Sequence, residues 1–546
     1  MQFITQEKMT CDVLIIGSGG AGLRASIAAV SSGADVLMVS KNRIGHTTNT
    51  YLSKAIIASS GWGDDKDSSI VHSRDTLQGG RNLNNPGMVA QLAETIKAET
   101  ALLKEWGVRF GENENGKPSI IKIPGHSYAR HLYGRNWKGS DLVLPLKRKA
   151  MESGVRFHEN MFVSSLVVPD SKICGVTGIS EEGKFLAIKA KTIILATGGF
   201  GHVFLNTNNA PGITGDGQAL ACEAGAVLQD MEFVQFYPTA LGKRGSRILL
   251  YERILEQDGV VLRNSIGEDI LVKNHASADI SRDQLARLIM REILEDPERR
   301  GTIIMDLGGL SKNMADSLSM LLPAQWFKGT RQFQVTPTTH FCMGGVVVDN
   351  HGETSCPGLF AAGEVTAGAH GANRLGGNAL AEVIAMGALV GKAAADKAMV
   401  IDSISGFDGA VHKEKVRLEA MFRDQGERPK KVIQELKETM WLNAGIVRDQ
   451  ASLDMAMEII MGREDIQALV LTSRDLIQFL EFRNMRLVAE MICRSALERT
   501  ESRGAHFRKD FPKENIKDWV KNIQVNKADS GLTLDQVSVP GGDLVL

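Results

Sequence analysis

Short apolar runs that end in glycine turns recur along this chain. Residues 12–16 are aliphatic after the first position, a glycine-rich turn follows at 17–22, and 23–30 is rich in good helix formers. The order strand, glycine turn, helix is that of a dinucleotide-binding βαβ unit. A second apolar run at 35–40 stands where the next strand of such a unit belongs.

The glycines of this turn have distinct physical roles in such a unit. Gly17 permits the tight turn, Gly19 lets the backbone approach a pyrophosphate, and Gly22 lets the helix pack close to the strand. The free N–H groups at the start of the helix attract phosphate groups. The second strand ends in Ser40-Lys41 instead of the usual acidic residue that holds a ribose, so the pattern favours a dinucleotide but points less clearly to NAD.

Two further runs of the same kind decide the cofactor. Residues 191–199 and 358–364 each read as a strand that ends in a glycine turn. In flavoproteins of the two-part Rossmann type, such strands return to the first sheet and close over FAD. The three runs in this order predict an FAD site, and by analogy Glu364 takes the ribose role.

Composition adds the size class and excludes several functions. The chain has 546 residues, 43% hydrophobic and 23% charged, which is typical of a soluble globular protein with two or three domains. Its formal net charge of -1 provides no field for nucleic acid or an anionic membrane. No secretory signal is evident, and the apolar stretches at 13–16 and 385–395 are too short to span a bilayer. We expect a cytoplasmic protein that meets a membrane only through a partner, if at all.

The cysteines are scattered and form no C-x-x-C pair. This argues against an iron–sulfur cluster or a zinc site built by this chain alone, so we expect no metal ligands. We expect reduced and partly buried thiols at all six positions, which are Cys11, Cys174, Cys222, Cys342, Cys356 and Cys493.

Several longer motifs carry a resemblance to a known family. They are GSGGAG at 17–22, ATGG at 196–199, TGDG at 214–217, DMEFVQFYPT at 230–239, THFCMGG at 339–345, HGANRLGGNAL at 370–380 and ESRGAHFRKDFP at 501–512. In these motifs the chain resembles the flavoprotein subunits of succinate dehydrogenase and fumarate reductase, a family to which L-aspartate oxidase also belongs.

The resemblance implies an α/β fold with an inserted domain. It divides the chain into a two-part Rossmann-type FAD-binding domain at 1–240 and 340–400, an α+β capping domain at 241–339, a helical domain at 401–510 and a C-terminal tail at 511–546. The family clamps its substrate between the capping domain and the flavin, which excludes water during hydride transfer.

The resemblance also implies a catalytic set. A planar carboxylate is well gripped by an arginine fork and a histidine, and Arg374 and His340 match the family's pair. The family's proton donor is an arginine of the capping domain, which matches Arg282. Because arginine has a pKa above about 12, it needs an acidic neighbour that reprotonates it, and Glu252 matches that residue. The relay's second arginine is replaced by Leu255, and Arg253 is a candidate substitute.

Two tyrosines replace residues with which the family binds a second carboxylate. Tyr237 stands for its histidine and Tyr251 for its threonine, so both become candidate substrate-binding residues. Phenolic hydroxyls still donate hydrogen bonds, but they add bulk and no charge. The sequence therefore leaves open a dicarboxylate such as fumarate, and a substrate with one carboxylate and an aromatic or amide end.

The predicted flavin attachment is non-covalent. Family members often link FAD to a histidine of a His-Thr pair, but the flanking register places Asn49-Thr50, not His46-Thr47, at that position. An amide cannot form the histidyl bond. The full predicted cofactor set is Gly17, Gly19, Gly20, Ala21, Gly22, Ser40, Lys41, Asn49, Thr50, Ala196, Thr197, Gly198, Asp216, Glu364, Asn378 and Leu380.

Four functions remain open at this point. The first is the flavoprotein subunit of a fumarate-reductase-like complex that exchanges electrons with an iron–sulfur partner. The second keeps that chemistry on another enoate or its saturated acid, and the third is L-aspartate oxidase. The fourth is a flavin electron-transfer subunit without substrate chemistry, against which Arg282, His340 and Arg374 argue, since an electron carrier needs no carboxylate grip.

Overall fold

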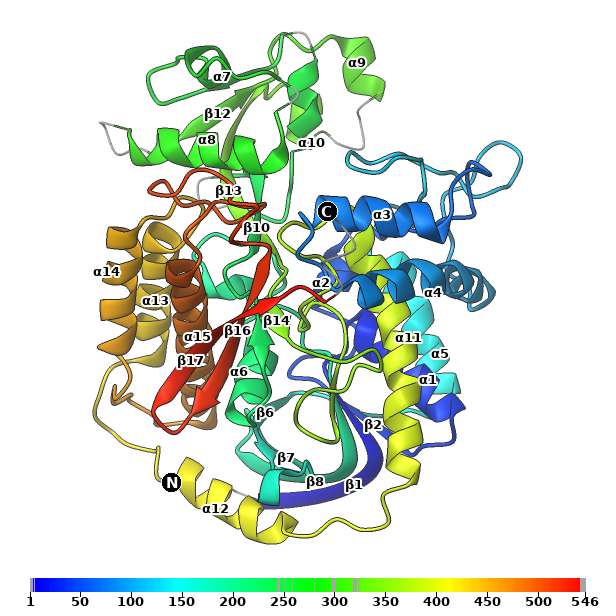
Figure 1. Cartoon of the computed structure of the whole chain (residues 1–546), viewed down its shortest axis with the longest axis vertical. Helices are drawn as coiled ribbons and strands as arrows, with labels where there is room; N and C mark the ends of the chain where they lie inside the picture. The colour runs from blue at the N-terminus through cyan, green and yellow to red at the C-terminus, as the bar shows by residue number, and fades with distance from the viewer. Residues whose placement is uncertain are drawn as a thin grey trace.

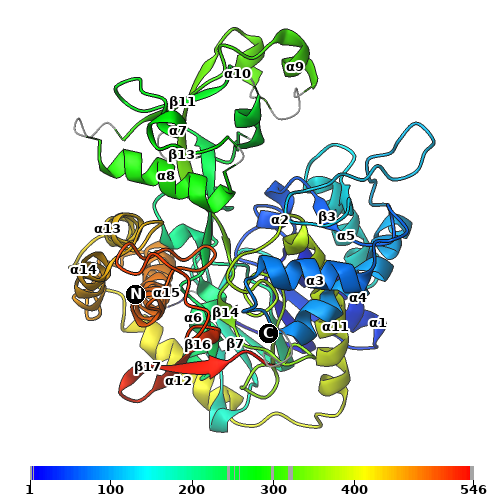
Figure 2. The same cartoon turned by 45° about the horizontal axis from the view of Figure 1, so that its top comes forward.

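A computed structural model of the chain describes residues 3, 5–242, 246–250, 252–257, 259–278, 280–296, 301–317, 322 and 324–540. Figure 1 shows a body of sheet and helices, a lobe above it that stands on two strands, and a helical bundle at one side. In Figure 2 the lobe comes forward and remains separate from the body except at its base. The two strands at that base therefore position whatever the lobe contributes to the body.

The central sheet has seven strands and contains all three predicted runs. Its order is β5-β2-β1-β8-β7-β6, with β15 also paired to β8. The pairs β2–β1, β1–β8 and β8–β15 are parallel. The bounds are β1 (Thr5–Ile16), β2 (Val36–Val39), β5 (Arg156–His158), β6 (Met161–Val167), β7 (Gly175–Ser180), β8 (Lys184–Leu195) and β15 (Leu359–Ala361). The carboxyl ends of β1, β2, β8 and β15 thus meet at one edge, where a Rossmann-type sheet binds its ligand.

One group of helices packs beside this sheet, with α1 and α11 in mutual contact (Figure 1). The group comprises α1 (Gly20–Ser31), α2 (Asn49–Leu52), α3 (Ser69–Gly79), α4 (Pro86–Glu105), α5 (Ser140–Glu152) and α11 (Asn378–Met399), with a β3 (Ile56–Ala58) and β4 (His131–Tyr133) pair. In the described part of the chain, α11 alone is long and apolar enough to cross a membrane, but 72% of its most apolar window is buried inside the protein. Its apolarity is that of a core helix.

The lobe has its own sheet and its own apolar core. The sheet order is β10-β13-β12-β11, and all pairs are antiparallel. A separate buried cluster extends from Leu250 to Val335 and includes Leu285, Ile289 and Trp326. The bounds are β10 (Val234–Leu241), η3 (Glu252–Glu256), β11 (Val261–Arg263), α7 (Ile270–Lys273), α8 (Arg282–Leu294), β12 (Ile303–Asp306), α9 (Lys312–Ser317), α10 (Ala324–Phe327) and β13 (Gln332–Cys342).

The C-terminal part consists of helices followed by a hairpin. The helices are α12 (Phe407–Glu419), α13 (Pro429–Asn443), α14 (Gln450–Met461) and α15 (Ser473–Glu498). The residues expected to form a tail, 511–546, contain instead β16 (Lys521–Ala528) and β17 (Gly531–Ser538), which join β9 (Leu228–Gln229) and β14 (Gly345–Val346) in a four-stranded sheet. Buried Ile523 and Val525 anchor this hairpin to the body.

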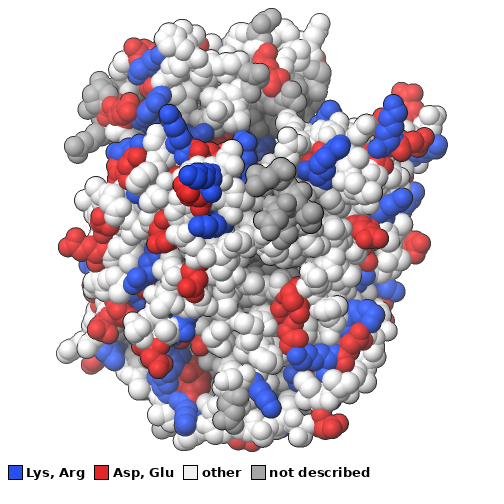
Figure 3. Space-filling view, viewed as in Figure 1, with Lys and Arg blue, Asp and Glu red and all other residues white. Residues whose placement is uncertain are grey.

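The predicted fold class is confirmed. A two-part Rossmann-type sheet, an inserted α+β lobe, hereafter the capping domain, and a C-terminal helical domain are all present. Short elements complete the body: η1 (Pro169–Ser171), η2 (Gly201–Val203) and α6 (Asp216–Glu223). Acidic and basic side chains are intermixed on the face in Figure 3, in keeping with the small net charge.

Candidate active site

The first glycine turn closes tightly against the end of β8. Gly17 has a φ of +109°, and a Cβ there would lie 2.3 Å from the carbonyl oxygen of Ala196. A Cβ on Gly22 would lie 2.1 Å from the carbonyl oxygen of Gly17, so α1 packs directly on the turn. Only glycine fits both positions, as the sequence predicted. The N–H of Gly20, in the first turn of α1, donates to the hydroxyl of Thr50 at 3.1 Å.

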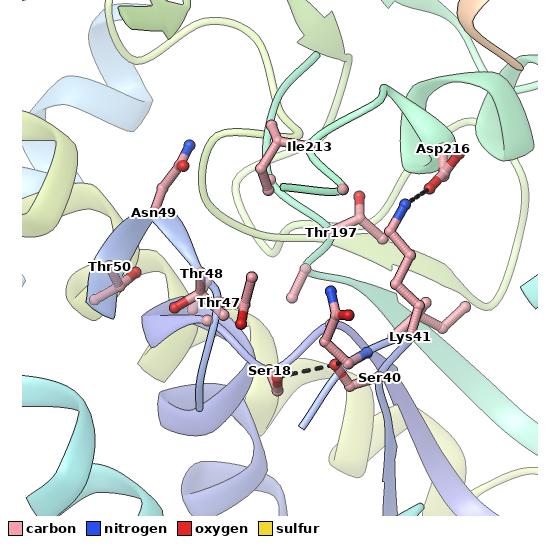
Figure 4. A pocket seen from close by; sticks show the side chains of 18 of the residues that line it. Ser18, Ser40, Lys41, Thr47, Thr48, Asn49, Thr50, Thr197, Ile213 and Asp216 are labelled. Carbon is pink, nitrogen blue, oxygen red and sulfur yellow. Dashed lines mark hydrogen bonds and ion pairs between the residues drawn. The ribbon is translucent and has the colours of Figure 1, made fainter. Parts of the chain in front are cut away.

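A cavity of about 990 Å³ that opens to solvent extends from this turn. This volume includes open solvent at the mouth of the cavity. Most of the predicted cofactor set lines it: Gly17, Gly19, Gly20, Ala21, Ser40, Lys41, Asn49, Thr50, Ala196, Thr197, Gly198, Asp216 and Glu364. In Figure 4 the side chains of Asn49 and Lys41 lie on opposite sides of this cavity.

On the side of the cavity that Lys41 lines, an ion pair connects the FAD-binding domain with α15 of the helical domain. The Lys41 ammonium contacts carboxylate oxygens of Asp216 at 2.6 Å and Glu481 at 2.9 Å. Although burial opposes it, these two carboxylates raise the pKa of Lys41, so the side chain is charged. Ser18 donates to Ser40 at 3.1 Å beside it. Asp216 and Glu481 therefore both place a carboxylate at the side chain of Lys41, two residues after the end of β2, where a Rossmann domain binds a ribose.

Glu364 lies on the Asn49 side of the cavity, away from the end of β2, and its predicted ribose role stays a prediction. Its carboxylate accepts hydrogen bonds from Asn49 Nδ2 at 3.0 Å and from the backbone N–H of Cys342 at 3.2 Å. Neither partner belongs to β2. Strand order explains this position, because β15 pairs with β8 on the side away from β2. Burial raises the pKa of Glu364 to about 7, against the hydrogen bonds from Asn49 and Cys342.

This raised pKa predicts a pH-dependent stability. The carboxyl group binds its proton more tightly in the folded protein, so its contribution is fully present below about pH 4.5 and is lost as pH rises through about 7. In thermal unfolding of Glu364→Gln and the native protein from about pH 5 to about pH 8, the Tm of the variant relative to the native protein should therefore rise with pH. A Tm difference that does not change over this range would contradict the assignment.

Arg374 is a buried cation with spare donor capacity. It is 8% exposed, and its guanidinium donates to Gln235 Oε1 at 2.9 Å and to the Leu375 carbonyl at 3.1 Å. Its Nε has no hydrogen-bond partner, and no described carboxylate lies within ion-pair distance. Burial, and then the charge of Arg282, lowers the pKa of Arg374 to about 10, which leaves it charged at neutral pH. The carboxylates of Glu364, Glu382 and Asp283 favour its charge from a distance, but no described carboxylate pairs directly with this buried fork.

His340 lies beside Arg374 as a neutral ring. Its Nδ1 lies 3.0 Å from Asn208 Nδ2 and 3.4 Å from Asn208 Oδ1, and the shorter contact corresponds to the tautomer in which Nδ1 accepts and Nε2 carries the proton. Burial, then the charges of Arg374 and Arg282, hold the pKa of His340 well below its usual range. A neutral histidine with an N–H at Nε2 can donate a hydrogen bond to a carboxylate without needing a charge of its own.

The capping domain brings Arg282 to the same place. Arg282 is the first residue of α8, whose N-cap Ser281 forms a capping box with Gln284. Its guanidinium lies over the ring of Tyr237 with 4.8 Å between the guanidinium carbon and the ring centroid. The Tyr237 and His340 rings meet edge to face at 5.6 Å. The pairing of β10 with β13 explains these contacts, since Tyr237 is opposite Thr338 and Gln235 is opposite Phe341.

Arg282, Arg374 and the neutral ring of His340 form a cluster, hereafter the cationic cluster after its two arginines, which adjoins the cavity on its Asn49 side. Asn49 lines the cavity and donates to Asn209 at 2.7 Å, and the preceding residue Asn208 contacts His340. Glu364 bonds to Cys342, two residues after His340. The structure thus brings together the three residues on which the predicted chemistry depends, next to the cavity that the glycine turn opens.

Some predicted residues are placed elsewhere. Gly22, Asn378 and Leu380 do not line the cavity. The Asn378 side chain contacts His72 at 2.8 Å and Thr76 at 2.9 Å, and its backbone N–H donates to the Leu375 carbonyl at 3.3 Å. Tyr251 lies outside the described residues. Glu252 begins η3, and the structure describes its backbone but not its side chain.

Sequence reasoning missed the amides that hold the site together. Asn208 and Asn209 connect Asn49 with His340, and Gln235 contacts Arg374. The signals were an Asn-Thr-Asn-Asn run at 206–209 shortly before the TGDG motif, and a glutamine in the QFYPT segment. The cysteine prediction is correct in that all six thiols are free and buried.

The residues around the cavity fit FAD. The backbone approaches closely where Gly17, Gly22 and Ala196 meet. At the start of α1 the N-cap residue is a glycine without a side chain, and among the first N–H groups that of Gly20 donates to Thr50. The hydroxyl of Thr197, which lines the cavity, is buried without a hydrogen-bond partner. The pyrophosphate of FAD would accept hydrogen bonds from N–H groups at the start of α1, and a polar part of the cofactor next to Thr197 would supply the hydrogen-bond partner that its hydroxyl lacks.

Comparison with known proteins agrees with this geometry. The FAD binding domain model matches residues 12–380, and the fumarate reductase flavoprotein C-term model matches 433–540. One of the subunits of fumarate reductase (CoM/CoB) from Methanothermobacter marburgensis is 35% identical over 95% of this chain and 98% of its own length. L-aspartate oxidase from Saccharolobus solfataricus is 32% identical over 93% and 98%. The structure of Mycobacterium smegmatis Sdh1 in complex with UQ1 superposes with a TM-score of 0.89, at 30% identity over 97% of this chain and 94% of that one.

Proposed function

The chain belongs to the fumarate reductase and succinate dehydrogenase flavoprotein family and is an FAD-dependent oxidoreductase, and from this premise we propose that it interconverts an enoate and its saturated acid. The observation that carries the proposal is the buried, charged guanidinium of Arg374, whose Nε is unpartnered next to the FAD cavity. A substrate carboxylate would supply both the missing hydrogen bond and the missing countercharge.

Each residue of the cluster has a separate task in this reaction. When bound, FAD supplies hydride exchange at flavin N5 with one carbon of the C=C bond. Arg374 binds the substrate carboxylate, and neutral His340 donates to it from Nε2, which together fix the reacting carbons relative to the cavity. Arg282 delivers a proton to the second alkene carbon and regains one afterwards, so that hydride plus proton convert the enoate into the saturated acid.

The substrate panel that tests this proposal uses reduced viologen as electron donor. Fumarate, crotonate and cinnamate differ in the group at the far end from the shared carboxylate, and the holoenzyme should oxidise viologen with at least one of them. Turnover with fumarate alone would place a second carboxylate in the site. Viologen that stays reduced with every enoate would overturn the proposal.

A second candidate substrate class is an enoate with one carboxylate. Tyr237 is 5% exposed and lies under the Arg282 guanidinium, so its ring occupies space beside the proton donor without adding positive charge. Crotonate or cinnamate turned over faster than fumarate would favour this class. Formation of ammonia and peroxide from aspartate would identify an L-aspartate oxidase activity instead.

We expect FAD to be held without a covalent bond. Asn49 lines the cavity on the side next to the cationic cluster, and both polar atoms of its amide are hydrogen-bonded. Its Nδ2 donates to Asn209 and Glu364, and its Oδ1 accepts from the Ala210 N–H. The ring of His46 packs against Tyr51 at 5.2 Å. Acid precipitation of the holoenzyme should therefore release yellow flavin into the supernatant. A yellow pellet whose flavin remains on a peptide containing His46 would contradict the prediction.

The electron partner that we propose is an iron–sulfur subunit. The supporting fact is that the relative from Methanothermobacter marburgensis is named as one subunit of its fumarate reductase. A partner of this kind would exchange electrons with the flavin and could bring this chain to a membrane, while the chain itself stays cytoplasmic. Co-purification of a two-cluster iron–sulfur protein with the native holoenzyme would support the assignment.

A further inference from the structure

A chain of hydrogen bonds runs from the capping domain to Arg374. Asn373 Nδ2 donates to Asp283 Oδ2 at 2.9 Å, and Gln235 Nε2 donates to Asn373 Oδ1 at 2.8 Å. The Arg374 guanidinium in turn donates to Gln235 Oε1 at 2.9 Å. Asp283 is on α8 of the capping domain, Gln235 is near the start of β10 at the base of that domain, and Asn373 and Arg374 lie in the loop before α11.

The two ends of this chain fix the orientation of the amides between them. A carboxylate only accepts hydrogen bonds and a guanidinium only donates them, so Asn373 must present its NH₂ to Asp283 and Gln235 must present its oxygen to Arg374. Gln235 Nε2 also donates to the Arg374 carbonyl at 3.0 Å. Without Asp283, the Asn373 amide is free to turn, and its contact with Gln235 loses the constraint that orients the guanidinium.

Asp283 directly follows Arg282, the residue that we assign to proton delivery. The same turn of α8 therefore carries both the proton donor and the group that begins the chain to Arg374. Further along α8, the Arg287 guanidinium lies over the Phe507 ring at 4.8 Å, which holds the helix against the body. Contact of α8 with the body thus completes two parts of the site at once. Burial raises the pKa of Asp283, and the charges of Arg282 and Arg287 act against this shift.

We propose that Asp283 is a positioning residue that couples docking of the capping domain to the orientation of the carboxylate-binding Arg374. The inference rests on the proposed function, because it takes Arg374 as the group that grips the substrate. Asp283 acts on Arg374 through Asn373 and Gln235, and it contacts neither the substrate nor the flavin.

Binding of carboxylates to the oxidised holoenzyme tests the positioning role of Asp283 separately from proton delivery. The dissociation constants of fumarate and crotonate are measured from the change that each causes in the flavin absorbance spectrum, with no electron donor present. Asp283→Ala and Asn373→Ala should each weaken binding about 10-fold, since each removes one charge-assisted link of the chain. The double variant should bind no more weakly than either single variant, because both changes break the same chain.

Two further variants serve as controls. Asp283→Asn keeps an oxygen that accepts from Asn373 and should bind within about threefold of the native protein. Asp306→Ala removes another capping-domain carboxylate, one that pairs with Arg263 inside that domain, and should leave the dissociation constants unchanged.

Three results would overturn the inference. They are unchanged binding in Asp283→Ala, an equal loss in Asp283→Asn, which would indicate that charge next to Arg282 matters rather than the hydrogen bond, and additive losses in the double variant. Absence of any carboxylate-induced spectral change in the native holoenzyme would instead contradict the proposed function itself.

Discussion

Replacing Arg282 with alanine is expected to lower kcat by about 10²- to 10⁴-fold, the usual contribution of a positioned general acid. Arg282 is the residue of the capping domain that reaches the cationic cluster, where it lies over Tyr237 and influences the pKa of both His340 and Arg374. Its loss removes the proton source while the carboxylate grip stays in place, so KM should change far less than kcat.

Arg291→Ala provides the matched control on the same helix. Arg291 is in the last turn of α8, is exposed and bonds to Asn274 within the capping domain, away from the cluster. Its removal should change kcat by no more than about twofold. Full turnover in Arg282→Ala, with FAD content equal to that of the native enzyme, would show that another group delivers the proton.

Replacing Arg374 with alanine is expected to lower kcat/KM by about 30- to 4,000-fold. Truncating one partner of a buried, hydrogen-bonded charge pair costs about 2–5 kcal/mol, and each 1.4 kcal/mol is a factor of ten. Arg374 satisfies the conditions for this range because it is buried, charged and without a described carboxylate partner until a substrate binds. Steady-state kinetics with an enoate that the native enzyme reduces measures the loss.

Arg374→Lys distinguishes the shape of this group from its charge. A lysine restores a positive charge but lacks the planar fork that donates to Gln235 and the substrate together, so its activity should lie between alanine and arginine. If Arg374→Lys equals the native enzyme, the fork is unnecessary. If Arg374→Ala retains native kcat/KM, the carboxylate binds elsewhere.

The dinucleotide turn could be predicted from sequence because its causes are local. Gly17, Gly19 and Gly22 are five residues apart at most, and the strand before them and the helix after them are encoded in the same short segment. The prediction that residues 191–195 and 358–361 return to the same sheet was also correct, because these residues belong to β8 and β15. By contrast, the predicted ribose role of Glu364 depends on where β15 enters the sheet, and its position beside β8 puts Glu364 on the Asn49 side.

The C-terminal hairpin and the amide contacts illustrate what sequence alone does not contain. In 521–538 two alternating runs flank an Asp-Ser-Gly turn, which is a hairpin signal, but pairing with β9 joins residues almost 300 positions apart. Asn208, Gln235 and Asn373 have ordinary sequence neighbours, and their roles exist only where β10, β13 and the loop before α11 meet. Arg282, His340 and Arg374 were found because the resemblance supplied their motifs.

The most direct measurement is a single turnover of the reduced holoenzyme with an enoate under anaerobic conditions. FAD is reduced, the enoate is added, and the flavin spectrum and the products are followed together. The account predicts that oxidised flavin returns with stoichiometric formation of the saturated acid, and that Arg282→Ala slows this step by about 10²- to 10⁴-fold while still binding the carboxylate. Flavin that stays reduced although the enoate binds, or reoxidation at the native rate in Arg282→Ala, would contradict it.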